Sequence, residues 1–344
     1  YEMLRSLVGS EMCIRDRLRD TQKEYNVDST LYSYYLRCKA EMRSPIVMQM
    51  ADTLFHMADK KKDQRMQAVA LSTKVDYYYY QNGQTDSISH YVDIVKEFAK
   101  QTSQPKYYYF AWSKRLINHY IKQYQYNTAL YEANKMMKEA EQEKYMEGIA
   151  SAYNVLTSIY QFKHLFNLAI ENKRKEIEII LQYDLDKYNI STAYSVLAYL
   201  YSESGETDKT LECLQESAAY LYSSTHEFHH YTRFAQYYTN IGDFPQAWKY
   251  LEKARELSET KKEVQKNLQE YYEVLKKYYV NIKQYEKALK AQDHITTLSG
   301  RNTEQNIEAA LNRASIYYKM GNMSQAAQYL SLIHISEPTR LLSI

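Results

Sequence analysis

The segment Tyr231–Ala254, which reads YTRFAQYYTNIGDFPQAWKYLEKA, decides the fold of this chain. Its first half places apolar residues at helical spacing on one face: Tyr231, Ala235 and Tyr238. Gly242 is positioned to end that first helix, and Asp243 to cap a second. The second helix carries its own inward face: Phe244, Ala247, Leu251 and Ala254. Small alanines facing large aromatic rings let two helices interlock, but one such pair buries too little core alone, so neighbouring pairs must stack.

The same pattern recurs along the chain. An upstream copy consists of Tyr194, Leu197, Ala198, Tyr201, Gly205 and Leu214, and a downstream copy of Ala310, Ala314, Tyr317, Gly321 and Ala326. Weaker copies fill the intervals, and the helix expected over residues 45–59 reads as the second half of the first pair. The sequence therefore predicts about seven helix pairs over residues 18–330, at a period of about 37 to 41 residues.

Composition excludes several classes of function. The 44 basic and 42 acidic side chains nearly cancel, which gives no electrostatic argument for nucleic-acid binding. The 7 glycines never fall in a phosphate-binding spacing, so no nucleotide or other cofactor is expected. Cys38 and Cys213 lie too far apart to indicate a disulfide framework or metal site, and are expected to be buried packing residues. No apolar run of about twenty residues predicts a membrane span.

Both ends are expected to be artefact. Glu11–Asp16 back-translates to GAG ATG TGT ATA AGA GAC, and the reverse complement of that string, in a shifted frame, falls within the codons of Leu330–Ser336. This shared stretch resembles a transposase-type adapter used to build sequencing libraries. Residues 1–17 and 331–344 are accordingly assigned to adapter, residues 18–330 to the repeat array, and the native gene is expected to continue in both directions.

The Ala-x-x-Tyr face followed by Gly and an inward Ala resembles the tetratricopeptide repeat. That resemblance implies an all-α, right-handed superhelical solenoid of about seven TPR-like helix pairs. It also implies that the first helices line a concave surface that binds a peptide or a protein partner rather than performing catalysis, so the fragment is not expected to be an enzyme.

Groove positions carried over from the repeat family select polar side chains able to hold a peptide backbone or a carboxylate. These are Lys114, Asn118, Asn154, Ser158, Ser195, Tyr199, Thr232, Gln236 and Asn240. Lys114 and Asn118 resemble the opening of the carboxylate clamp of chaperone-binding members. The clamp pattern then fails, because Val155 stands where Asn is expected, and a chaperone C-terminus is not the favoured ligand.

Two other strings suggest chemistry. His226, Glu227 and His230 satisfy His-Glu-x-x-His, the zinc metallopeptidase motif. Ser224, three residues before Glu227, favours a helix capping box instead, so the match is interpreted as chance and no metal is expected.

The run Tyr77–Tyr80 could present a stacking platform, but consecutive residues point around a helix. Core packing plus one rim residue is the preferred interpretation.

The segments Tyr35–Ala40 and Ala51–Phe55 and the long Tyr-rich repeats resemble the periplasmic sensor region of TPR-containing membrane-tethered regulators of Gram-negative gut anaerobes. This resemblance implies a ligand-sensing region, tethered to the inner membrane in the full-length protein, with self-association as a possible response and a kinase or DNA-binding output beyond the C-terminal end. The alternatives are a cytoplasmic Rap-like peptide receptor and a passive assembly scaffold.

Overall fold

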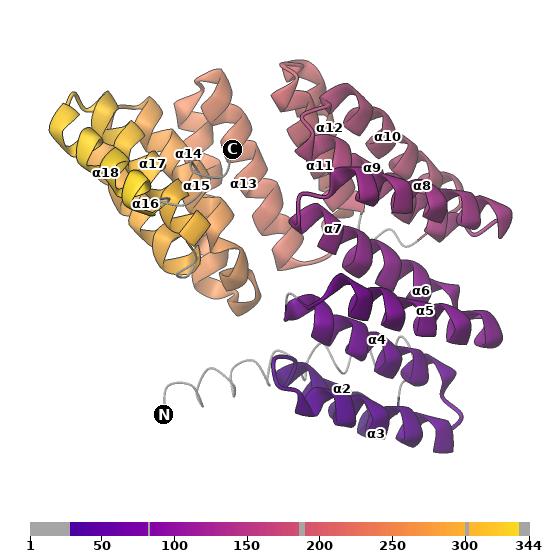
Figure 1. The fold of residues 1–344 in the computed structure, drawn as a ribbon. Helices are drawn as coiled ribbons and strands as arrows, with labels where there is room; N and C mark the ends of the chain where they lie inside the picture. The colour runs from indigo at the N-terminus through magenta and orange to yellow at the C-terminus, as the bar shows by residue number, and fades with distance from the viewer. Residues whose placement is uncertain (1–27, 82, 186–189, 300–302, 337–344) are drawn as a thin grey trace. The chain divides into compact units, whose positions relative to one another are not determined.

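The computed structural model describes residues 28–81, 83–185, 190–299 and 303–336. In these residues helices alternate with short turns, and no described residue lies in a β-strand. The helices form two compact units, which divide the sequence between Ser204 and Gly205. Unit 1 runs from indigo to magenta in Figure 1, and unit 2 runs on to yellow.

In unit 1, first helices alternate with second helices along the chain. The first helices are α2 (Ser29–Ala40), α4 (Gln64–Tyr80), the consecutive segments α6 (Pro105–Ala111), η1 (Trp112–Ile117) and α7 (Asn118–Lys122), then α9 (Met146–Phe162) and α11 (Ile190–Glu203). The second helices are α3 (Ile46–Lys60), α5 (Thr85–Thr102), α8 (Tyr126–Gln142) and α10 (Phe166–Gln182). Helix α2 packs on α4, α4 on α6, and α6 on α9, so these first helices form one continuous layer.

Unit 2 repeats the arrangement. It begins with α12 (Thr207–Ser217) and the 3₁₀ turn η3 (Ala218–Tyr220). Three pairs follow: α13 (Ser224–Ile241) with α14 (Phe244–Thr260), α15 (Leu268–Asn281) with α16 (Tyr285–Ser299), and α17 (Thr303–Lys319) with α18 (Met323–Ser336). The 3₁₀ segment η4 (Lys262–Asn267) joins α14 to α15. The first helices α13 and α15 contact each other directly.

The pair α13/α14 confirms the interlocking predicted for Tyr231–Ala254. Ala235, Ala247, Leu251 and Ala254 are buried together, and Tyr231, Tyr238 and Phe244 pack against them. Gly242 ends α13 in the left-handed region at φ 84°, and the side chain of Asp243 accepts a hydrogen bond from the backbone N–H of Gln246. The small size of these fully buried alanines allows the two helices to lie close together.

Many inter-helix turns contain one residue in the left-handed conformation, and this residue is not always glycine. Gly205 and Gly321 have φ 80°, while Tyr124, Lys144 and His164 adopt φ 57°, 52° and 56°. A side chain in this conformation costs about 1 to 2 kcal/mol relative to the right-handed one. The repeats with non-glycine turns therefore carry weaker sequence signals, although they have the same geometry.

One first helix contains a π-helical turn. Between α6 and α7, residues Trp112–Ile117 form η1. In an α-helix, residues five apart point about 140° away from each other, since each residue turns by about 100°. A π turn holds more residues and brings positions i and i+5 toward the same side. Phe110 and Arg115 stand in that relation, with the Arg115 guanidinium carbon 4.9 Å from the Phe110 ring centroid.

The all-α helical-repeat class is confirmed. Within the described residues, seven helix pairs are seen, four in unit 1 and three in unit 2, and α11 and α12 lie between these two sets in the sequence. The helix expected over residues 45–59 is α3, and Cys38 and Cys213 are buried. None of the described helices combines the length and apolarity needed to cross a bilayer. Residues 1–17 lie outside the described residues, and the adapter assignment remains a prediction.

Candidate binding groove

A cavity of about 700 Å³ opens on the first-helix layer of unit 1. Three successive first helices, α2, α4 and the α6–η1 helix, together with the turn after α2, supply its walls. The lining consists of Tyr35, Lys39, Met42, Arg43, Val69, Ser72, Thr73, Asp76, Tyr80, Lys106, Tyr107, Phe110 and Arg115. We call this cavity the α2–α6 groove. It lies on the surface where the tetratricopeptide resemblance places a ligand.

Arg115 is held in the wall of the groove from several sides. Its Nε lies 2.5 Å from Oδ1 of Asp76 on α4, and each of these side chains is only 14% exposed. The guanidinium carbon lies 5.2, 5.4 and 4.9 Å from the ring centroids of Tyr79, Tyr80 and Phe110. Burial alone would lower the pKa of Arg115, but the hydrogen bond and charge of Asp76 raise it above its usual value. The side chain is therefore a fixed cation.

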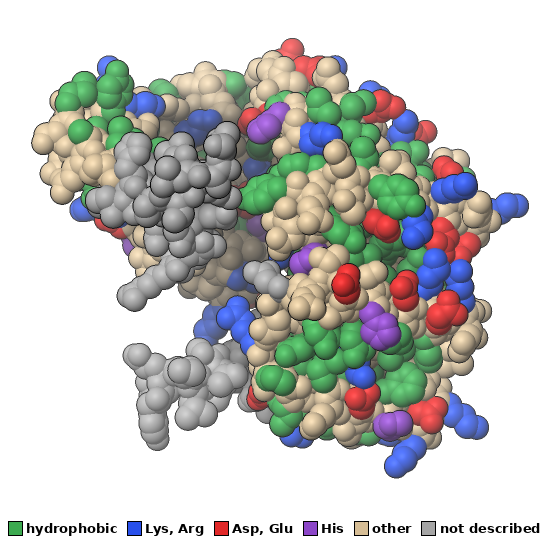
Figure 2. Space-filling model, in the orientation of Figure 1, with side chains coloured by type: hydrophobic (Ala, Val, Ile, Leu, Met, Phe, Trp, Pro, Cys, Tyr) green, Lys and Arg blue, Asp and Glu red, His purple; other side chains and the backbone are tan. Residues whose placement is uncertain are grey.

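The groove has an excess of positive charge. Asp76 is the one carboxylate among the described residues that line it, and Arg115 neutralises that carboxylate. Lys39, Arg43 and Lys106 remain, and all three are exposed at the rim. On the face seen in Figure 2, side chains of both charges are interspersed with hydrophobic ones. Since the 44 basic and 42 acidic side chains of the full sequence nearly cancel, the imbalance is a local property of the groove.

Aromatic side chains supply much of the apolar wall. Tyr80 and Phe110 are 53% and 46% exposed, which is unusual for rings of their size on a helix surface. Tyr35 is more enclosed, and burial, the largest cause, raises the pKa of its phenol above the ordinary value. Tyr80 is the rim residue expected from the Tyr77–Tyr80 run, in which Tyr79 is buried and Tyr78 stacks on Tyr91.

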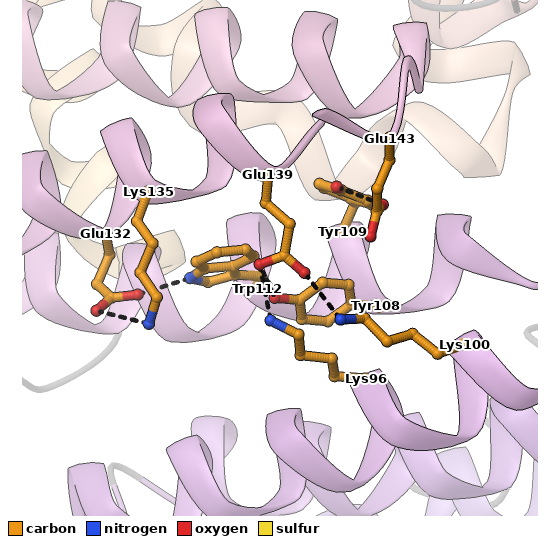
Figure 3. A network of polar contacts seen from close by, with 9 residues as sticks. All are labelled: Lys96, Lys100, Tyr108, Tyr109, Trp112, Glu132, Lys135, Glu139 and Glu143. Carbon is orange, nitrogen blue, oxygen red and sulfur yellow. Dashed lines mark hydrogen bonds and ion pairs between the residues drawn. The ribbon is translucent and has the colours of Figure 1, made fainter. Parts of the chain in front are cut away.

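The other side of α6 is anchored to two second helices. Figure 3 shows Lys96 and Lys100 of α5 and Glu139 of α8 converging on the face of α6 that carries Tyr108. Lys96 Nζ lies 2.7 Å from Glu139 Oε2, and the Tyr108 hydroxyl donates to the same oxygen at 3.3 Å. The indole of Trp112 donates to Glu132 at 2.9 Å. This network holds α6 in place, so the groove residues on its opposite side are presented by a fixed element.

The structure brings two predicted groove residues, Lys114 and Asn154, beside one buried ion pair; both are partly buried, and neither lines the α2–α6 groove. Lys173 on α10 is ion-paired with Glu176, and its Nζ donates to Asn154 Oδ1 at 3.1 Å. Burial lowers the pKa of Lys114; the charge of Glu176 opposes this shift and that of Lys173 adds to it. Lys114 and Asn154 thus belong to one electrostatic neighbourhood. Val155, the position at which the clamp pattern fails, is buried in the core.

The remaining predicted groove residues are dispersed. Three of them hydrogen-bond to a carbonyl of their own helix: Asn118 to Lys114, Ser158 to Asn154, and Thr232 to Phe228. Ser195 is buried, Tyr199 is partly buried and Asn240 is exposed. A ligand role for each of these residues remains a prediction.

Gln236 lines a second cavity, of about 470 Å³, on the first-helix layer of unit 2. Its Oε1 accepts from Arg233 Nη1 at 3.0 Å, and Arg233 Nη2 lies 2.9 Å from Glu270 Oε1. His229 Nδ1 lies 2.6 Å from the other oxygen of Glu270. Burial opposes ionisation of Glu270, but the His229 hydrogen bond and the Arg233 charge hold its pKa below the usual value. Arg233, Gln236 and Glu270 therefore already pair with one another.

The His-Glu-x-x-His string lies in the first turns of α13. His226 and His230 are buried, and their Nδ1 atoms lie 3.2 Å from Ser223 Oγ and 3.1 Å from Ser217 Oγ. Among the described residues no group of three His, Cys, Asp or Glu side chains is arranged to hold a metal ion. The helix cap is Ser223, which accepts from the His226 N–H, so the prediction that Ser224 opens a capping box with Glu227 was wrong by one residue.

The sequence prediction missed the α2–α6 groove. It began its groove positions at Lys114, one residue before Arg115. The local signal that could have found the groove is a basic side chain close in sequence to an aromatic ring on each of the first helices α2 and α6. Lys39 lies 5.0 Å from the Tyr35 ring centroid, and Lys106 lies 5.1 Å from that of Tyr107. The π turn that orients Arg115 has no such signal.

No known family profile matches the sequence, and no curated protein sequence matches it significantly. Solved structures do resemble it. The apo form of the quorum sensor NprR from B. thuringiensis has a TM-score of 0.60 at 12% identity, with 97% of this chain and 96% of that chain covered. Aspartyl phosphate phosphatase F from Bacillus subtilis has a TM-score of 0.60 at 12% identity, with 98% of this chain and 91% of that chain covered.

The APC/C hetero-tetramer Cut9-Hcn1 has a TM-score of 0.57 at 13% identity, and the match covers 95% of this chain and 58% of that chain. At these identities the likeness shows the fold alone. The chain therefore has a tetratricopeptide-like helical-repeat fold.

Proposed function

We propose that this chain is the ligand-recognition region of a signalling or regulatory protein and that it binds a peptide, or an extended segment of a protein partner, in the α2–α6 groove. The observation that supports this most directly is the groove itself: a cavity of about 700 Å³ with exposed aromatic rings and a fixed guanidinium. Cavities of roughly 300 to 1,000 Å³ are the usual size for binding sites of small ligands.

The chemistry of the groove suits a peptide better than a small apolar molecule. Helices expose no unpaired backbone edge, so recognition must come from side chains. Tyr80 and Phe110 offer apolar contact, while Arg115 and the rim cations offer polar contact. This mixture matches an extended chain in which apolar and polar groups alternate. Binding without chemical change is the proposed activity.

Binding would be transmitted through the stacking of helices. A ligand that contacts α2, α4 and the α6–η1 helix together favours the spacing of those three helices at which all its contacts form. Small shifts between packed helices are a common form of signalling transition. On this proposal the chain is the sensing region of a periplasmic, membrane-tethered regulator, as the resemblance of its Tyr-rich repeats suggests.

A cytoplasmic peptide receptor is the second candidate. It is favoured by the likeness to the quorum sensor NprR, which extends over nearly the whole of both chains. Both candidates use the same groove and differ in where the ligand is encountered and in what responds. A passive scaffold, the third alternative, would bind its partner without any change that a ligand reverses.

The groove can be tested with a double variant, Tyr80→Ala with Phe110→Ala. Both rings are about half exposed, so their removal should leave the fold intact. Peptides selected by the full chain from a random phage library should bind this variant at least tenfold more weakly, because the apolar contacts are lost. Tyr131→Ala is the matched control, since Tyr131 is 66% exposed on α8 and does not line the groove. Equal binding by the double variant and the control would refute the proposal.

A further inference from the structure

The α2–α6 groove contains a fixed guanidinium, that of Arg115, and not all of its N–H donors are hydrogen-bonded among the described residues. Asp76 occupies the Nε edge of Arg115, and Nη1 donates to the carbonyl of Lys114 at 3.2 Å. Within the described residues, no hydrogen bond is made by Nη2. A guanidinium with one partner on each of two nitrogens still has N–H donors available to another acceptor.

The three rings around Arg115 determine how those donors are presented. Tyr79, Tyr80 and Phe110 lie within 5.4 Å of the guanidinium carbon and limit its movement. A side chain restrained in this way loses less entropy on binding than a free arginine. Two of the rings, Tyr80 and Phe110, also line the groove. Apolar contact surface and hydrogen-bond donors therefore occur side by side.

The cations at the rim of the groove also favour an anionic ligand. Lys39, Arg43 and Lys106 have no carboxylate partner among the described residues. They raise the local positive potential and favour the approach of an anionic ligand. A nucleic acid would require a track of basic side chains spaced along a backbone. Here the cations surround one bounded cavity, which suits a single carboxylate.

We infer that the groove recognises an acidic peptide: a carboxylate that binds the free donors of Arg115, next to an aliphatic or aromatic side chain that packs on Tyr80 and Phe110. This inference rests on the proposed function and specifies its ligand. In this arrangement Arg115 anchors the ligand directly. Asp76 positions Arg115 and competes with the ligand carboxylate for its charge.

The test uses the full chain, immobilised, and three pools of capped hexapeptides whose flanking positions are randomised among Leu, Ile, Val, Phe and Tyr. One pool carries a fixed central Glu with an amidated C-terminus, the second a central Gln with an amidated C-terminus, and the third a central Gln with a free C-terminus. Retained peptides are quantified by mass spectrometry. We expect the Glu pool to be retained about tenfold or more over the amidated Gln pool.

The third pool separates the two sources of a carboxylate. Retention of the free C-terminus at the level of the Glu pool would show that a terminal carboxylate is also accepted. Equal retention of the two amidated pools would overturn the inference and leave the proposed function standing. Failure to retain any pool would count against both. Binding of a single-stranded oligonucleotide in preference to all peptides would also overturn the inference.

Two variants separate anchoring from support of the fold. Arg115→Gln should abolish the preference for the Glu pool, and Arg115→Lys should restore part of it, because charge returns without the planar donors. Asp76→Asn removes the same ion pair but frees the guanidinium, so it should keep or strengthen the preference. Arg255→Gln, an exposed arginine of unit 2 paired with Glu259, is the control. If Arg115→Gln and Asp76→Asn lost the preference for the Glu pool equally, with both variants folded, the ion pair would have only a structural role and the inference would be wrong.

Discussion

His230 links α12 to α13 inside unit 2. Its Nδ1 lies 3.1 Å from the hydroxyl of Ser217, and that hydroxyl donates its own proton to the carbonyl of Leu214 at 2.7 Å. The hydroxyl has one proton, so the imidazole must donate from Nδ1. Burial lowers the pKa of His230 to about 4. The folded protein therefore keeps this side chain neutral down to about pH 4.

This histidine predicts a loss of stability in mild acid. In the unfolded chain a histidine takes up its proton near pH 6.5, whereas in the folded chain His230 does so only near pH 4. Between these values the unfolded state binds more protons, so the free energy of unfolding falls as pH falls. The loss due to His230 from pH 6.5 to pH 5 is at most about 2 kcal/mol.

Urea denaturation of the parent and of His230→Gln at pH 7 and pH 5 measures this contribution. The variant should lose less stability on acidification than the parent. His226 and His119 also have a pKa lowered by burial, so some acid sensitivity should persist in the variant. An identical pH dependence in the two proteins would show that His230 does not titrate as expected.

For single residues, the repeat register identified polar groove candidates, but it did not identify the residues with which they interact. Asn154 was selected for its position on a first helix, yet its side chain accepts from Lys173 on a second helix. Repeat register says which face a residue occupies. It does not say which residues of another helix approach that face, because this depends on tertiary packing. Arg115 was missed for a related reason, since the π turn shifts the register on which the prediction depended.

Gly148 marks a close approach of three helices. It lies in α9, and a Cβ built on it would meet Tyr145 Cδ1 at 2.8 Å, Ala140 Cβ of α8 at 3.0 Å and Tyr109 Cε1 of α6 at 3.0 Å. Glycine within a helix is less favourable than alanine by about 1 kcal/mol. Glycine is therefore present here because α6 and α8 approach α9 too closely to leave room for a Cβ.

Gly148→Ala should destabilise unit 1 by up to about 2 kcal/mol. Overpacking a filled site costs typically about 1 to 3 kcal/mol, and the gain in helix propensity offsets about 1 kcal/mol of that cost. Chemical denaturation followed by circular dichroism measures the change. Asn134→Ala, at an exposed position of α8, gives the propensity gain without the clash and serves as the control. A stabilised Gly148→Ala protein would show that the helices separate without cost.

Elements were predicted well where turn glycine and inward alanine coincide. Around Gly242, the start and end of both helices follow from local chemistry. Turns such as that at Lys144 have the same left-handed geometry without the glycine, so their repeats could be found only through the apolar period. The helix ends are encoded locally in the first case and imposed by packing of the neighbouring pair in the second.

For the whole molecule, the location of the groove predicts that unit 1 suffices for binding. Every lining residue of the α2–α6 groove lies between residues 35 and 115. A fragment of residues 28–204 should therefore be helical and should retain peptides from the same pools within about threefold of the full chain, because repeat arrays depend mainly on contacts between neighbouring pairs. Circular dichroism and the retention assay check both statements. A folded fragment that retains nothing would place part of the site in unit 2.

The division between Ser204 and Gly205 has no distinct signature in the sequence. Gly205 occupies an ordinary left-handed turn with φ 80°, much like Gly242 at 84°. The repeat period therefore predicts one array through this point. The local sequence predicts that helices form and pair. The grouping of these pairs into units depends on how well the surfaces of neighbouring pairs pack together, and a local sequence pattern does not contain that information.

The π turn at Trp112–Ile117 gives the groove a marker that homologues can reveal. This segment holds one residue more than a regular α-helix would need to bring Phe110 and Arg115 to the same side. In a homologue of the same length without the π turn, the residues at these two positions would point about 140° apart, since each residue turns by about 100°. A homologue that lacks one residue between them would instead place them at i and i+4, on one face of an α-helix. A one-codon deletion here is therefore expected to keep the ring and the cation together, whereas a same-length segment that forms a regular α-helix is expected to separate them.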